Sequence, residues 1–124
     1  MSEKVLIEEA KRRIETYKNL KHYLRIILDS IRELDNLAEI YLFGSVVEGT
    51  YTYSSDIDVL VITNSKPEEV ISTLWSKGVE TPFEIHVINK NVLNRYEKRS
   101  RIIRLEDFLK KLEESDASLT SSPP

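Results

Sequence analysis

The stretch YLFGSVVEGTYTYSSDIDVLVI, residues 41–62, contains two of the three glycines of this 124-residue chain and decides its fold. Just before it, the run AEIYLF, residues 38–43, is rich in β-branched and aromatic residues and ends at a glycine, which predicts a strand. The run IDVLVI, residues 57–62, is apolar on both alternating faces after Asp58, as expected of a strand in the middle of a sheet. The residues that join these two strands are therefore predicted to lie at one edge of the sheet.

Two carboxylates, Asp56 and Asp58, stand at the start of the second strand. Residues two apart on a strand point to the same face. Two acids placed in this way can hold a pair of divalent ions, and carboxylate oxygen is the ligand that Mg²⁺ prefers. Acids that merely began a strand would repel each other unless a cation joined them. The pair therefore indicates a two-metal Mg²⁺ site of the kind used in phosphoryl and nucleotidyl transfer.

The turn after the first strand is interpreted as a phosphate-binding turn. If the two strands are antiparallel neighbours, Gly44 and Ser45 lie beside the two acids. Gly44 would let the backbone approach a ligand closely, and a short helix starting at Ser45 would aim free N–H groups and a hydroxyl at a phosphate. Gly49 would end that helix in a left-handed conformation. An ordinary loop is the alternative.

A third acid, Glu84, lies in the predicted strand FEIHVI, residues 83–88. The connection between the second and third strands contains one predicted helix, and its length suits a parallel crossover. Because parallel strands start at the same sheet edge, Glu84 would face the two acids, bind one metal and take a proton from an acceptor hydroxyl. A solvated edge carboxylate is the alternative. His86 lies on the same face and is interpreted as a packed or hydrogen-bonded neighbour rather than a catalyst.

These motifs resemble a known family. A Gly-Ser pair, ten intervening residues and then Asp-Ile-Asp is similar to the GS…DxD signature of the DNA polymerase β-like nucleotidyltransferase superfamily. The runs GSVVEG and SSDIDVLV resemble its minimal nucleotidyltransferase (MNT) branch, over roughly residues 38–90. The resemblance implies an α+β (α/β-like) nucleotidyltransferase fold with a mixed sheet of three or four strands flanked by helices. It also implies a catalytic, metal-binding triad of Asp56, Asp58 and Glu84, with Gly44 and Ser45 holding the triphosphate of an incoming nucleotide.

The activity that the resemblance implies is Mg²⁺-dependent transfer of a nucleoside monophosphate, by default AMP from ATP, to a hydroxyl group. Minimal members commonly pair with a helical HEPN toxin, and some act as antitoxins by transferring AMP to a toxin tyrosine. Two alternatives stay open: a small-molecule (aminoglycoside-type) nucleotidyltransferase and a non-catalytic binding antitoxin. The second is favoured by the lack of Lys and Arg in residues 36–65, because family members often carry Arg after the Gly-Ser pair.

Residues 1–114 are predicted to form a single domain, followed by a disordered tail over residues 115–124. Within it, we expect a long helix over residues 1–36, the catalytic core over residues 38–90 and basic C-terminal helices over residues 91–114. A helix of that length would run about 54 Å in a domain with a radius of gyration of roughly 14 Å, so it either breaks or projects. Its apolar stripe belongs either to the core or to a homo-oligomer interface.

The segment 90–111 holds eight Lys and Arg residues against three acids. An exposed helix face explains most such runs. The functional alternative is that one of these side chains closes over the nucleotide phosphates or meets an acidic or RNA-bearing partner, so direct nucleic-acid binding stays open. The candidates for this role are Arg95, Lys98, Arg99, Arg101 and Arg104.

The composition excludes several other classes. The chain has no Cys, which removes disulfides, thiol nucleophiles and zinc knuckles and fits a reducing cytoplasm. It lacks an apolar run long enough to span a membrane, and its N-terminus carries Glu and Lys where a signal peptide would be apolar. We therefore expect a cytoplasmic protein with no membrane association.

Overall fold

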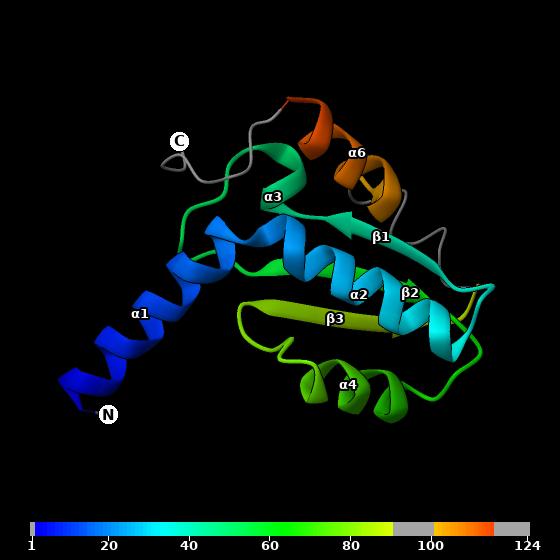
Figure 1. The fold of residues 1–124 in the computed structure, drawn as a ribbon, viewed down its shortest axis with the longest axis horizontal. Helices are drawn as coiled ribbons and strands as arrows, with labels where there is room; N and C mark the ends of the chain where they lie inside the picture. The colour runs from blue at the N-terminus through cyan, green and yellow to red at the C-terminus, as the bar shows by residue number, and fades with distance from the viewer. Residues whose placement is uncertain (1, 91–100, 116–124) are drawn as a thin grey trace.

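A four-stranded mixed sheet with helices packed against it forms the fold, in a computed structural model that describes residues 2–90 and 101–115 (Figure 1). The strand order is β3-β2-β1-β4. β1 pairs antiparallel with β2 and with β4, whereas β2 pairs parallel with β3. The strands are β1 (Glu39–Phe43), β2 (Ile57–Ile62), β3 (Phe83–Ile88) and β4 (Ile103–Arg104). The predicted α+β class, the central position of β2 and both predicted pairings are confirmed.

Five helices occupy the described residues. They are α1 (Glu3–Lys18), α2 (Leu20–Leu34), α3 (Ser45–Glu48), α4 (Pro67–Ser76) and α6 (Leu105–Ser115). None of the helices in residues 2–90 and 101–115 combines the length and apolar character needed to cross a membrane.

The long N-terminal helix breaks at Asn19. The Asn19 backbone N–H donates to the carbonyls of Glu15 and Thr16, and its side chain donates to the Glu15 carbonyl at 2.9 Å. These bonds close the last turn of α1, and α2 starts in a new direction at the next residue. α2 then runs along the sheet, while α1 projects beyond it (Figure 1). The predicted N-terminal helix is therefore interrupted at Asn19, and its first half also projects from the domain. Both outcomes that its length allowed are observed.

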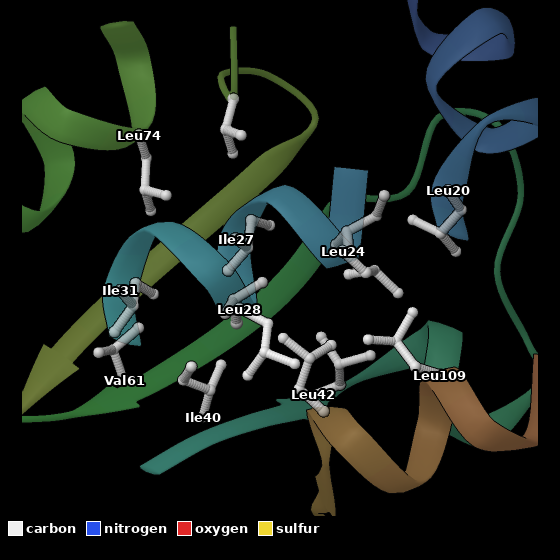
Figure 2. Close-up of a cluster of buried hydrophobic side chains, with 14 of the residues drawn as sticks. Leu20, Leu24, Ile27, Leu28, Ile31, Ile40, Leu42, Val61, Leu74 and Leu109 are labelled. Carbon is white, nitrogen blue, oxygen red and sulfur yellow. The ribbon is translucent and has the colours of Figure 1, made fainter. Parts of the chain in front are cut away.

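The main core lies between one face of the sheet and the helices α2, α4 and α6. Figure 2 shows α2 side chains above the strands, with Leu74 of α4 and Leu109 of α6 closing the two sides. Burying an aliphatic side chain of this kind contributes about 1.5 to 3 kcal/mol to stability. The apolar stripe of α2 is therefore core and not an oligomer interface. It consists of Leu20, Leu24, Ile27, Leu28 and Ile31.

Exposed apolar side chains are found instead on the projecting part of α1. Val5, Leu6 and Ile7 are 46%, 55% and 50% exposed. Association through the N-terminal helix remains a prediction, and it now concerns this half of α1 alone.

The opposite face of the sheet carries a smaller apolar cluster of Tyr41, Leu60 and Ile62, with Phe43 and Ile88 packed against it. Side chains alternate between faces along a strand, so Asp58 of β2 shares this second face with Leu60. Glu84 and His86 of β3 lie in register with Asp58 and Leu60 and share it too. The polar residues of interest therefore lie on the face opposite the main core.

The basic C-terminal segment is only partly helical where the structure describes it, because residues 103–104 form β4 before α6 begins. Arg104 donates to Glu39 at 3.1 Å and its guanidinium lies 5.4 Å from the ring centre of Tyr41. Glu39 is at the end of β1 away from Asp58, so Arg104 does not contact the predicted phosphate turn. Arg95, Lys98 and Arg99 lie outside the described residues, as does the tail beyond Ser115.

Candidate functional site

The strand register brings the acids to one edge of the sheet. Phe43, the last residue of β1, lies opposite Asp58, and Glu84 lies opposite Asp58 on the other side. Gly44 and Ser45 follow Phe43 directly, so the turn after β1 lies beside Asp58. This is the arrangement that the antiparallel and parallel connections predicted.

The turn itself has the predicted geometry. Gly44 has φ +79° and ψ −157°, a conformation that is essentially restricted to glycine. Its carbonyl accepts hydrogen bonds from the N–H groups of Val47 and Glu48, both at 3.1 Å, which forms the single turn of α3 from Ser45 onward. Gly49 ends α3 in the left-handed conformation, with φ +77°. Gly44, Ser45 and Gly49 thus build a tight turn over the start of β2.

Asp58, Glu84 and His86 form a group of possible metal ligands. One donor atom from each lies within 4.8 Å of the others. Nε2 of His86 is 3.5 Å from Oδ1 of Asp58 and 3.7 Å from Oε1 of Glu84. The Asp58 and His86 side chains are mostly buried, whereas the Glu84 side chain is 54% exposed. Two carboxylates and an imidazole, open to solvent on one side, fit a divalent cation.

The electrostatics of Asp58 agree with this fit. Burial raises the pKa of its carboxyl group, contact with His86 lowers it, and the negative charges of Glu84 and Asp56 raise it further. The ionised carboxylate is therefore disfavoured by its surroundings. A cation bound at this point would remove that penalty.

Asp56 lies outside the group that the structure brings together. β2 begins at Ile57, so Asp56 precedes the strand and is not held in the strand alternation that the sequence suggested. Its Oδ1 atom is 3.4 Å from a guanidinium nitrogen of Arg13, and its side chain is 52% exposed. Asp56 remains close enough to Asp58 to raise the pKa of that residue. A part for Asp56 in binding metal stays a prediction.

Two residues of α1 hold the segment that leads into the acids. Arg13 donates to the carbonyls of Ser54 and Ser55, each at 3.2 Å, and Tyr17 donates to the Ser55 carbonyl at 2.7 Å. The Tyr17 ring also stacks on Tyr51, with ring centres 5.4 Å apart.

The sequence pattern alone indicates no role at the site for Arg13 or Tyr17. The available signal was that Arg13 stands in an otherwise apolar row of residues seven apart in the N-terminal helix. Arg13 supplies a guanidinium group near the acids. Residues 36–65 cannot provide such a group, because they contain no Lys or Arg.

Comparison with known proteins shows the family to which the chain belongs. Residues 24–118 match the family model of the nucleotidyltransferase domain. Because this match spans most of the chain, the protein belongs to the nucleotidyltransferase domain family. A crystal structure of a "putative nucleotidyltransferase" from Sulfolobus solfataricus is similar over 79% of this chain and 83% of that one, with 22% sequence identity and a TM-score of 0.46. No curated protein matches the sequence significantly.

Proposed function

We propose that this nucleotidyltransferase uses Mg²⁺ to transfer AMP from ATP to a hydroxyl group, and that the acceptor is a tyrosine of a HEPN-type partner protein. Family membership supports the reaction class. The observation that carries the proposal furthest is the register of β1, β2 and β3. It places Asp58 between Glu84 and the turn that starts at Gly44.

The residues present fit the metal that this chemistry requires. Asp58 and Glu84 would hold Mg²⁺, with Asp56 as the further carboxylate of a two-ion site. When bound, the ions activate the attacking oxygen and neutralise the charge of the leaving phosphates.

The side chains and backbone of this chain would do the remaining work. The N–H groups at the start of α3 and the Ser45 hydroxyl would hold the triphosphate, and Gly49 would keep the turn tight. The Glu84 carboxylate would accept the proton of the acceptor hydroxyl. As that oxygen bonds to the α-phosphorus, the bond to the β-phosphate oxygen breaks and pyrophosphate leaves.

A protein acceptor agrees with the exposure of the site. The side chains of Asp56 and Glu84 are each about half exposed, so a tyrosine on a second protein can reach them. A small-molecule acceptor would need a binding pocket built around the same acids. The cytoplasm, where ATP is abundant, is the compartment that we propose for the reaction.

Incubation with radiolabelled ATP, Mg²⁺ and a candidate HEPN-type protein tests the proposal. The candidate is the product of the neighbouring gene where that product is a small helical protein. We expect label on the partner with wild-type enzyme and none with Asp56→Ala/Asp58→Ala. A matched control, Asp29→Ala/Asp107→Ala, removes two exposed carboxylates from α2 and α6 and should leave the transfer intact.

Other results would identify the alternatives. Label on a small hydroxyl compound, but not on the partner, would favour the small-molecule enzyme. Neutralisation of the partner without any label would favour the non-catalytic antitoxin. If the enzyme binds ATP and Mg²⁺ and still labels no acceptor, the proposed reaction is wrong.

A further inference from the structure

We propose that His86 is itself a metal ligand, and that it makes the centre at Asp58 and Glu84 prefer a transition-metal dication such as Zn²⁺ over Mg²⁺. The inference deepens the proposed function and rests on it for the location of the centre. It adds a nitrogen donor to a centre that was predicted from carboxylates alone.

The distances between the donors suit a shared ion. Nε2 of His86 lies 3.5 Å from Oδ1 of Asp58 and 3.7 Å from Oε1 of Glu84, and one donor atom from each of the three residues lies within 4.8 Å of the others. Two donors that each lie about 2.1 Å from one ion are separated by roughly 3.0 to 3.4 Å, depending on the coordination geometry. Small side-chain rotations would therefore bring all three donors onto a single ion.

Neighbouring residues hold the His86 imidazole and the Asp58 carboxylate in place. The ring centres of Phe43 and His86 are 5.2 Å apart and the rings are tilted by 56°, so the phenyl group restricts the imidazole. The two oxygens of Asp58 have different neighbours. Oδ2 lies against Gly44, whereas Oδ1 is the oxygen nearest to His86. Oδ1 is therefore the oxygen positioned to share an ion with Nε2 and Glu84.

The chemistry of the donors sets the preference. Mg²⁺ binds oxygen ligands in a strict octahedron and keeps several waters, whereas Zn²⁺ and related ions bind imidazole nitrogen strongly. Two carboxylates alone would offer only oxygen ligands, so the type of ligand would not make the centre bind one of these ions in preference to the other. Adding Nε2 strengthens the binding of a transition-metal ion much more than the binding of Mg²⁺.

Isothermal titration calorimetry with Zn²⁺ and with Mg²⁺ tests this on the full chain. His86→Phe keeps a ring against Phe43 and removes the donor. We expect it to weaken Zn²⁺ binding by roughly tenfold or more while changing Mg²⁺ binding by less than about threefold. His22→Phe, which removes the other histidine from an exposed position on α2, should change neither affinity.

Nuclear magnetic resonance of the wild-type imidazoles provides a second readout, which is needed if His86→Phe does not fold. Zn²⁺ should shift the ¹⁵N resonance of His86 Nε2 directly and leave the His22 ring nitrogens unchanged. An unshifted Nε2 resonance, or an equal loss of Zn²⁺ and Mg²⁺ affinity in His86→Phe, would overturn the inference.

The outcome separates this inference from the proposed function. Mg²⁺-supported nucleotidyl transfer with no Zn²⁺ preference would leave the proposed function standing and refute the role of His86. A Zn²⁺ preference that depends on His86, in a protein that transfers no nucleotide, would support the role of His86 and refute the proposed function.

Discussion

Gly44 lies against the carboxylate of Asp58 so closely that a Cβ atom at position 44 would overlap Oδ2. The two residues come from different strands, since Gly44 follows β1 and Asp58 belongs to β2. The glycine therefore serves two purposes: it adopts the positive φ of the turn and it leaves room for the acid. The turn and the acid form one unit.

Replacing Gly44 by alanine should damage the metal centre as well as the fold. The positive φ costs about 1 to 3 kcal/mol for a residue with a side chain, and the new methyl group must also displace the Asp58 carboxylate. Gly78→Ala is the matched control, because Gly78 has φ +85° and open space around it. We expect both variants to unfold at lower urea concentration, and Gly44→Ala alone to lose metal affinity in calorimetry. Wild-type metal binding by folded Gly44→Ala would contradict the close contact.

Arg13 should stabilise the segment that carries Asp56. Arg13→Ala removes the hydrogen bonds to the carbonyls of Ser54 and Ser55 and the contact with Asp56. We expect a loss of about 1 kcal/mol in the free energy of unfolding, together with faster amide exchange in residues 52–56. Arg12→Ala, which removes an exposed ion pair with Glu80, is the control and should cost less than about 0.5 kcal/mol. Equal effects of the two variants would mean that Arg13 does not hold this segment.

Asp58 should destabilise the metal-free protein at neutral pH. Its pKa is raised in the folded state, chiefly by burial and then by the nearby acids, so folding takes up a proton at pH values just above the ordinary carboxyl range. Stability from this group is complete below the pKa of the unfolded chain and is lost as pH rises through the folded pKa. Asp58→Asn in chelator should therefore melt above wild type at pH 7, with the difference shrinking toward pH 3.

Calorimetric melting curves across this pH range check the prediction for Asp58. Asp29→Asn, an exposed change on α2, should follow the wild-type curve at every pH. Added Mg²⁺ should stabilise wild type more than Asp58→Asn, because the amide lacks the negative charge that the Asp58 carboxylate offers the ion. A melting difference that does not depend on pH would show that the charge of Asp58 is not the cause.

The sequence predicted the parts of the site that depend on local pattern and connection length. The alternation within residues 57–62 and 83–88, and the helix between them, were sufficient to place Glu84 beside Asp58 in a parallel pair. Gly44 and Gly49 marked the ends of α3 because their positions require positive φ. These features arise from backbone geometry, which short stretches of sequence specify well.

The remaining features depend on contacts between distant segments. Arg13 lies more than forty residues before the carbonyls that it binds, and nothing in its own neighbourhood indicates that target. The departure of Asp56 from the strand follows from where pairing with β3 begins, at Ile57. Proximity of His86 to both acids depends on side-chain conformation and on the packing of Phe43, which strand alternation does not determine.

The measurement that tests the central claim most directly compares ATP labelled at the α-phosphate with ATP labelled at the γ-phosphate. Nucleotidyl transfer breaks the bond between the α- and β-phosphates. The account therefore predicts that the acceptor takes label from α-labelled ATP alone, that pyrophosphate is released in equal amount, and that Glu84→Gln and Asp58→Asn abolish both signals. Transfer of the γ-label, or α-label transfer that persists in Asp58→Asn, would contradict it.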